Sequence, residues 1–200
     1  MSANMRKRRS PDASPWWFLR LFAGSLVGTG SIKGSPIKGG AMTAPPFKPP
    51  KLSYPPMMSG PRVQQWQQQM KTRSWNIVPD GKFGPISRRT CANFQTEKGL
   101  EPDGVVDAAT WKATWEAPPA DPPPAPEEDL VHGSEGEHVR TWERQANRRG
   151  WRIKNIDGHY DDEDVRVCKQ MQHALGLPKT GVVDFDTWNA TWWENVPTTV

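Results

Sequence analysis

The sequence repeats one long phrase. Residues 103–115 read DGVVDAATWKATW, and residues 180–192, 77 positions further on, read TGVVDFDTWNATW. This offset holds back to the Asp-Gly pairs at 80–81 and 157–158, and one inserted residue near Asn155 makes it 76 upstream of that point. A long duplication at fixed spacing indicates two copies of one structural unit. The chain therefore carries a tandem pair of units of roughly 60 residues each, near the lower size limit of an independent domain.

Each copy has the pattern of three short helices. In the first copy Val63, Trp66 and Met70 recur at i, i+3 and i+7, which predicts an amphipathic helix with Pro61 in its first turn. In the second copy Ser134 and Glu137 have the spacing of a capping box at the start of the corresponding helix.

The segments that follow predict two ordered turns and two more helices. Each Asp-Gly pair predicts a tight turn with positive φ. A second helix follows it and ends at Gly99 or Gly176. Asp107 and Asp184 stand where they would cap a short third helix. We therefore predict an all-α fold, with two small three-helix bundles in tandem and little or no sheet.

The two cysteines occupy equivalent positions. Cys91 and Cys168 both lie on the apolar side of the second helical pattern. A disulfide between two separate cores is geometrically unfavourable, so each thiol is expected to be a small buried hydrophobe.

The basic charge lies outside the repeats. The chain has a net charge of +4, but residues 1–58 hold nine Lys and Arg residues against Asp12 alone, a balance of +8 that leaves −4 for the remainder. Such an arm attracts nucleic acid, anionic lipid or an anionic wall polymer, or is simply solvated chain. Binding to nucleic acid or an anionic polymer is therefore expected only through residues 1–56, a basic Gly/Pro-rich arm.

Three interpretations of the first residues stay open. The Arg-rich start and the apolar stretch Trp16–Val27 have the order of an export signal, but Arg20 interrupts the stretch. The stretch is too short for a stable membrane span, which needs about 20 apolar residues. The segment is an export signal, an arm that binds a membrane or a partner, or an extension upstream of a start at Met42. The TAPPFKPPKLSYPP segment after it is expected to be extended.

Taken in order, the motifs resemble the three-helix peptidoglycan-binding domain that is attached to bacterial and phage cell-wall hydrolases. The first copy carries Trp66-Gln67, Asp80-Gly81-Lys82-Phe83-Gly84-Pro85, Phe94-Gln95, Gly99-Leu100, Asp103-Gly104-Val105-Val106 and Thr110-Trp111. The second is more divergent, with Asp161-Asp162 for Gly-Pro, Met171-Gln172 for Phe-Gln and Thr180 for Asp. Both copies have Asp107 or Asp184 where the family usually has Gly. We expect domains at 57–117 and 130–196, joined by a Pro-rich linker at 118–129 that could hold them up to ~40 Å apart.

The resemblance implies non-covalent peptidoglycan binding by a groove with polar groups and an aromatic wall. Candidate ligand residues are the Asp-Gly turns, the aromatic residue after each turn, a glutamine of the second helix, and tryptophans at loop and helix ends. They are Asp80, Gly81, Phe83, Gln95, Trp75 and Trp115 in the first copy, and Asp157, Gly158, Tyr160, Gln172, Trp151 and Trp192 in the second. Turn formation and core packing are the alternative roles for these residues, and core packing is expected for Trp66, Trp111, Trp142 and Trp188.

Catalytic and metal-binding patterns are missing from the sequence. The run DGHYDDED at 157–164 lacks the alternating spacing of a calcium loop and reads as the acidic first turn of a helix. The four histidines have no zinc-site spacing, and Cys168 and His173 fall on different helix faces. After both repeats and the linkers are assigned, no stretch is long enough for a hydrolase. We expect no enzyme activity, no cofactor and no metal.

The sequence therefore favours a non-catalytic peptidoglycan-binding protein or the targeting subunit of a lytic system, encoded by a bacterial host or by a phage. Its place would be the cell wall, the extracellular space or a phage particle, with a cytoplasmic stage before release for a phage protein. Two weak modules on a repetitive polymer gain avidity, which is a physical reason for the duplication. The alternative is a structural or virion-associated interaction protein that uses the repeats as a scaffold and the basic arm to bind a partner.

Overall fold

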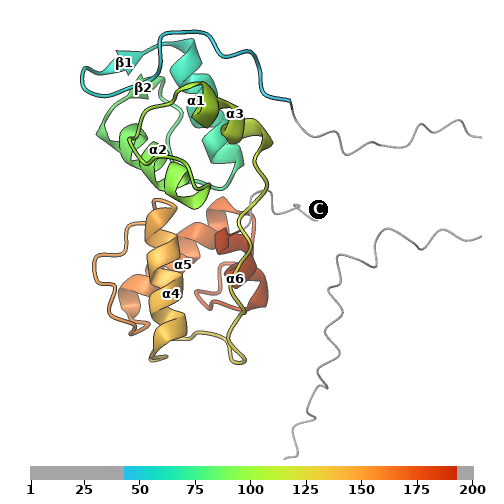
Figure 1. Ribbon diagram of the computed structural model, residues 1–200. Coiled ribbons are helices and arrows are strands. Elements are labelled where there is room, and N and C mark those ends of the chain that lie inside the picture. The colour runs from blue at the N-terminus through green and yellow to red at the C-terminus, as the bar shows by residue number, and fades with distance from the viewer. Residues whose placement is uncertain (1–42, 193–200) are drawn as a thin grey trace, which may run out of the picture. The chain divides into compact units, whose positions relative to one another are not determined.

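The computed structural model describes residues 43–192 (Figure 1). The first repeat contains β1 (Met58–Ser59), α1 (Pro61–Thr72), β2 (Lys82–Phe83), α2 (Pro85–Glu97) and α3 (Ala108–Glu116). The second contains α4 (Glu137–Arg148), α5 (Asp162–Ala174) and α6 (Phe185–Trp192). The prediction of two three-helix bundles with little sheet is confirmed. The apolar stretch Trp16–Val27 lies outside the described residues, and no helix within 43–192 has the length and apolar character to cross a membrane.

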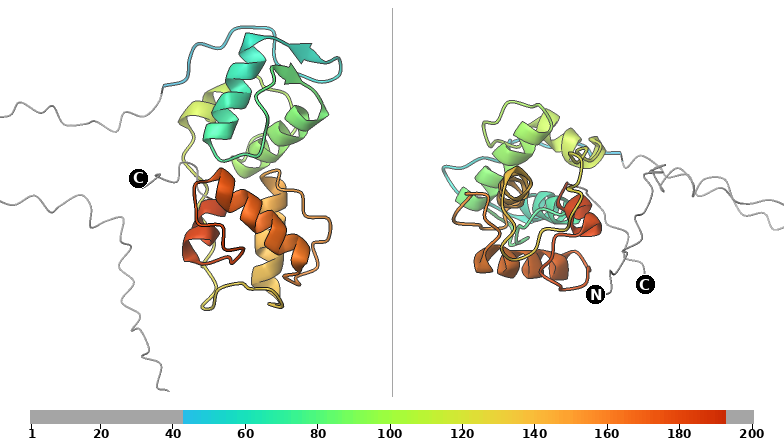
Figure 2. Two further views of the ribbon diagram at one scale, coloured as in Figure 1. Left: turned by 180° about the vertical axis from the view of Figure 1, so that it is seen from behind. Right: turned by 90° about the horizontal axis from the view of Figure 1, so that it is seen from below.

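The two repeats are built in the same way. The first helix packs against the third in each, α1 against α3 and α4 against α6 (Figure 2). An antiparallel ribbon joins the chain before the first helix to the chain after the Asp-Gly turn. Met58 pairs with Phe83 in the first repeat, and Glu135 forms a single bridge to His159 in the second.

Local sequence sets most helix starts. Pro61 begins α1. Asp107 Oδ1 accepts a hydrogen bond from the N–H of Thr110 at 2.8 Å, and Asp184 Oδ1 accepts one from Thr187 at 2.8 Å. These carboxylates satisfy N–H groups that have no partner within the helix, which confirms the predicted caps of α3 and α6.

The capping box predicted at Ser134 and Glu137 is wrong. The α4 helix is preceded by Gly136 and has no side-chain cap. Ser134 bonds to other segments instead. Its carbonyl accepts the N–H of Tyr160 after the Asp-Gly turn at 2.8 Å, and its Oγ accepts the N–H of Val131. The capping box of this repeat lies at the start of α5, where Asp161 and Asp164 accept each other's backbone N–H groups.

Each repeat has its own hydrophobic core. The four tryptophans predicted for core positions, Trp66, Trp111, Trp142 and Trp188, are at most 2% exposed. Cys91 and Cys168 are buried free thiols in the two cores, as the sequence predicts.

A Pro-rich segment upstream of each repeat packs on its core. Leu52 pairs with Val106 in an isolated antiparallel bridge, and Leu130 pairs with Val183 in the same way. The indole N–H of Trp111 donates to the carbonyl of Pro45 at 2.7 Å. That of Trp188 donates to the carbonyl of Pro123 at 3.0 Å. We call residues 43–53 and 122–131 the Pro-rich straps. They are part of the folded repeats, although the sequence interpretation placed them mostly in the arm and the linker.

The two repeats also contact each other within one compact unit of the chain. The N–H of Asn76 donates to the carbonyl of Arg149 at 2.8 Å. The buried Arg149 guanidinium pairs with Glu97 at 3.1 Å and lies 4.9 Å from the ring centre of Trp75. The Pro-rich segment therefore does not separate the repeats to the ~40 Å that its extended length allows.

Candidate functional site

The structure buries most of the predicted ligand residues. Seven of them are at most 7% exposed: Trp75, Phe83, Gln95, Trp151, Tyr160, Gln172 and Trp192. Trp115 is half-buried, with its ring packed 4.4 Å from that of Trp111. The Asp80 and Asp157 side chains are exposed at the Asp-Gly turns. The buried indoles offer no face to a sugar, so the structure gives them a packing role.

Gln95 and Gln172 hold a loop in place. Gln95 Oε1 accepts the N–H of Gly104 at 2.8 Å, and its Nε2 donates to Asp103 Oδ1 at 2.8 Å and Thr110 Oγ1 at 3.0 Å. Gln172 makes the same set of bonds to residues 180–187. Both the oxygen and the nitrogen of each buried amide are hydrogen-bonded. The amide therefore holds the loop between the second and third helices against the second helix.

A further glutamine does the same for the Asp-Gly turn of the first repeat. Gln67 Oε1 accepts the N–H of Gly81 at 2.8 Å, and its Nε2 donates to Asp80 Oδ1 and Ser87 Oγ. The sequence interpretation missed this role of Gln67. The signal that could have revealed it is the second Asp-Gly pair at 103–104, which Gln95 holds in the same way.

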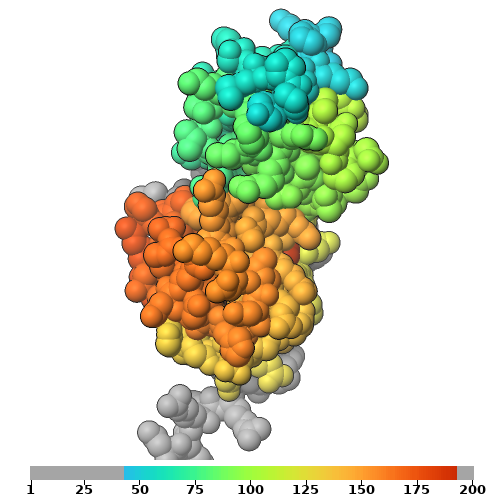
Figure 3. All heavy atoms as spheres, turned by 90° about the vertical axis from the view of Figure 1, so that its left-hand side faces the viewer, coloured from blue at the N-terminus to red at the C-terminus, as the bar shows by residue number. Residues whose placement is uncertain are grey.

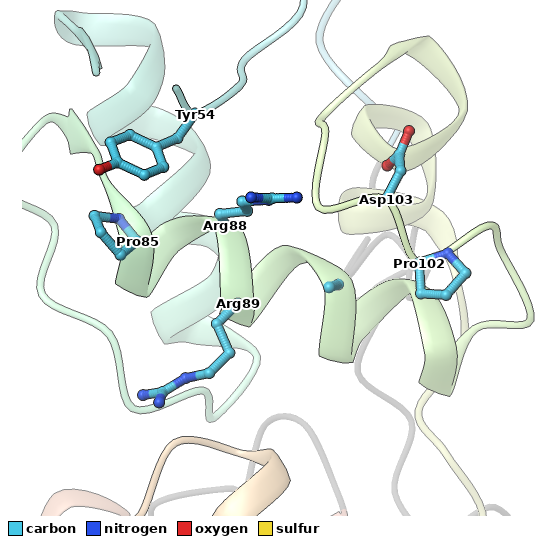
Figure 4. Close-up of a pocket in the computed structure, with 7 residues that line it drawn as sticks. Tyr54, Pro85, Arg88, Arg89, Pro102 and Asp103 are labelled. Carbon is cyan, nitrogen blue, oxygen red and sulfur yellow. The ribbon is translucent and has the colours of Figure 1, made fainter. Parts of the chain in front are cut away.

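A groove lies between the outer face of α2 and the loop after it (Figure 4). Arg88 extends between the Tyr54 ring and the loop that carries Asp103, while Arg89 points the other way. The lining residues are Tyr54, Pro85, Arg88, Arg89, Ala92, Pro102 and Asp103.

A glycine lets the loop approach the helix. Gly104 has φ +71°, and a Cβ there would lie 2.6 Å from Arg88 Cγ and 2.8 Å from the Arg88 carbonyl oxygen. Its counterpart Gly181 has φ +75° and would meet Lys169 Cε at 2.7 Å. Glycine is required here both for the positive φ and for the close contact.

The second repeat has a groove at the equivalent place. It is lined by Asp162, Val165, Arg166, Lys169, Gln170, His173 and Lys179. Five of these positions are 77 residues after positions that line the first groove. In Figure 3 the orange residues around α5 lie at the surface of the second repeat. The equivalence indicates that the duplicated fold forms this groove.

Both grooves present cations. Within residues 43–192, no salt bridge is formed by Arg88 or Arg89 in the first groove, or by Lys169 or Lys179 in the second, while Arg166 pairs with the half-buried Glu163 at 3.3 Å. Asp103 already accepts hydrogen bonds from Gln95 and from the N–H of Val105. Although residues 59–200 carry a net negative charge, the grooves are therefore suited to an anionic ligand.

Neither cysteine is a reactive thiol, and residues 43–192 hold no metal-ligand cluster. Burial raises the pKa of the Cys168 thiol to about 11 and also raises the pKa of Cys91, so both thiols are protonated at neutral pH. Among residues 43–192, no group of three or more His, Cys, Asp or Glu side chains could hold a metal ion.

A family model described as "Putative peptidoglycan binding domain" matches residues 59–113 and again residues 135–190. The two matches cover more than half of the chain, so this protein belongs to the peptidoglycan-binding domain family, as its motifs predict. No match was found among the curated proteins or among the solved structures.

Proposed function

We propose that the protein is a non-catalytic peptidoglycan-binding protein whose grooves on α2 and α5 hold the anionic peptide stems of the wall. The observation that carries this proposal is the recurrence of a cationic groove at equivalent positions of two repeats that both match the family. Membership of the peptidoglycan-binding domain family identifies the polymer. The positive charge of the grooves favours the anionic peptide stems of that polymer over its neutral sugars.

The groove chemistry fits a short acidic peptide. Arg88 and Arg89 offer planar guanidinium groups, which bind carboxylates through two parallel hydrogen bonds. Tyr54, Pro85 and Pro102 supply an apolar wall for aliphatic side chains. This combination of a few charged groups and apolar lining is typical of a site that orients a small ligand.

Duplication increases the retention of a weak binder on a polymer. When two modules engage one chain of repeats, the overall affinity exceeds that of either module by typically 10²–10⁴. A protein of this kind would target a separately encoded lytic enzyme to the cell wall, from the host or from a phage particle.

Co-sedimentation of the full chain with insoluble peptidoglycan tests this function. We would compare wild type with Arg88→Glu/Arg89→Glu, with Arg166→Glu/Lys169→Glu and with the combination of all four. Matched controls reverse exposed cations outside the grooves, namely Lys71→Glu/Lys112→Glu in the first repeat and Arg152→Glu/Lys154→Glu in the second.

Each groove variant is expected to lower the apparent affinity at least tenfold, and the fourfold variant should abolish retention. Each control pair changes the net charge as much as a groove pair does. Because the controls lie outside the grooves, they should sediment like wild type. Groove variants that fold normally and sediment like wild type would contradict the groove assignment.

A second wall preparation tests the ligand class. An amidase hydrolyses the amide bond between each stem and the glycan, which also removes the cross-links and releases soluble glycan strands with a free carboxylate at each attachment point. These strands are used as competitors in the co-sedimentation. We expect them not to displace the protein from intact wall, whereas full displacement would refute stem recognition and leave wall binding intact.

A further inference from the structure

Within residues 43–192, four buried side chains hold Gly-containing turns through the same kind of bond, and one of them differs from the other three. Gln67, Gln95 and Gln172 each accept a glycine N–H through Oε1 and donate through Nε2 to a hydroxyl in the first turn of the next helix. These donor–acceptor distances are 3.1 Å to Ser87, 3.0 Å to Thr110 and 3.1 Å to Thr187.

In the second repeat two carboxyl groups replace the amide and the hydroxyl. Glu143 stands 76 residues after Gln67, and Asp164 stands 77 residues after Ser87. Glu143 Oε2 accepts the N–H of Gly158 at 3.0 Å, as the glutamine oxygens do in the other sites. Both side chains are almost fully buried, 0% exposed for Glu143 and 2% for Asp164.

The remaining oxygens of this pair have no donor. Glu143 Oε1 and Asp164 Oδ1 are buried without a hydrogen-bond partner. Glu143 Oε1 takes the place of the Nε2 that bonds the hydroxyl oxygen in the other three sites. Two ionised carboxylates in this arrangement would be unsolvated and would repel each other, which is strongly unfavourable.

The surrounding charges are mostly acidic. Burial raises the pKa of Asp164 to about 7, with added repulsion from Glu143, from Asp161 just before α5 and from Asp157 in the turn. Burial also raises the pKa of Glu143, and the positive charge of Arg140 on α4 partly offsets this rise.

The other neighbours do not neutralise the pair. Tyr160 and Cys168, which also lie near Asp164, are buried and neutral at physiological pH because burial raises the pKa of each side chain. His159 is exposed and pairs with Glu135.

We propose that Glu143 and Asp164 share one proton, which takes the place of the amide hydrogen of the other three sites and makes the stability of the second repeat depend on pH. The first repeat has Gln67 and Ser87 at these positions and lacks this dependence.

The sign follows from which state holds the proton. In the unfolded chain both carboxyls ionise near pH 4, whereas the folded pair keeps its proton up to about pH 7. The folded state therefore binds more protons between these values, and the stability of the second repeat falls as pH rises from about 4 to about 7. Above that range it changes no further from this cause.

Thermal unfolding of the full chain between pH 4.5 and 8.5 tests the proposal. The matched variant Glu143→Gln/Asp164→Ser restores the residues of the first repeat, so it is expected to fold. The wild-type midpoint for the second repeat should fall as pH rises to 7, and the variant should change less and unfold about 5 °C or more higher at pH 8. The reciprocal variant Gln67→Glu/Ser87→Asp should give the first repeat the same pH dependence.

Infrared spectroscopy tests the proton directly. A protonated carboxyl band should persist in the wild type at pH 6 and be absent from Glu143→Gln/Asp164→Ser. Identical pH profiles for wild type and variant, together with no such band, would overturn the proposal. Stabilisation by added Ca²⁺ that a chelator reverses would also overturn it, because the pair would then bind a metal cation in place of the proton.

Discussion

Single buried amides carry much of the local order in this protein. Gln95 was a candidate ligand residue in the sequence, but in the structure it joins Gly104, Asp103 and Thr110. Its polarity therefore serves the fold, because each bond satisfies a group that would otherwise lie unpaired near the core.

Replacing Gln95 by leucine should destabilise the first repeat by about 3 kcal/mol, because the N–H of Gly104 and the hydroxyl of Thr110 would both lose a buried partner. Denaturant unfolding of the full chain measures this change. The exposed Gln65→Leu serves as the control and should change stability by less than about 0.5 kcal/mol. A Gln95→Leu variant as stable as the control would mean that the amide is not needed to hold the loop.

Asp80 should stabilise the folded first repeat only when its carboxyl group is ionised. The N–H of Lys82, at 2.9 Å, and the side-chain amide of Gln67 hold the pKa of Asp80 below its ordinary value of 3.8. Its contribution is therefore present above about pH 4 and lost as pH falls through the folded pKa. Asp80→Asn should flatten the acid limb of first-repeat stability between pH 5 and 2 in denaturant unfolding, and an unchanged limb would contradict this.

At the scale of the helix, the acidic run at 157–164 has a structural role. It supplies the capping box of α5 and places Asp162 and Glu163 in the first turn, where negative charge favours the helix dipole.

The two possible capping positions of the second repeat can be compared directly. Asp161→Ala should lower stability by about 1 kcal/mol, because the N–H groups of Glu163 and Asp164 lose their acceptor. Ser134→Ala should cost less, because Ser134 caps no helix and its hydroxyl accepts only the N–H of Val131. Thermal unfolding of both variants measures the difference, and a larger loss for Ser134→Ala would favour the capping box predicted from sequence.

At the scale of the whole molecule, the Pro-rich straps extend each folded repeat. Leu52 and Leu130 are at most 5% exposed and lie in the two cores. Polyproline-like chain makes few hydrogen bonds of its own, so these leucines and the indole bonds from Trp111 and Trp188 hold the straps on the repeats.

Leu52→Ala and Leu130→Ala should each destabilise their repeat by about 2–5 kcal/mol, because each leaves a cavity in a packed core. The partly exposed Leu100→Ala is the control and should cost less. Differential scanning calorimetry of the full chain measures all three. If the strap variants lose no more than the control, the straps are not part of the cooperative units.

The sequence by itself determined the duplication, the three helices of each repeat, the tryptophan cores and the aspartate caps of α3 and α6. These features depend on contacts within a few residues or on periodicity along one helix, so the pattern of the chain is sufficient. It also determined the family, because the motifs occur in the right order in both copies.

Only the tertiary structure decided which residues face outward and which lie together. The straps have no periodicity, and their contacts join residues about 50 to 65 positions apart, such as Leu52 with Val106 and Pro123 with Trp188. The grooves combine cations on one helix with a loop that a glycine brings against it. The proposed pairing of Glu143 with Asp164 depends on the burial of both side chains in the second repeat. Such contacts join residues that are far apart in the sequence. No local pattern reveals them, because these groups come together only when the chain folds.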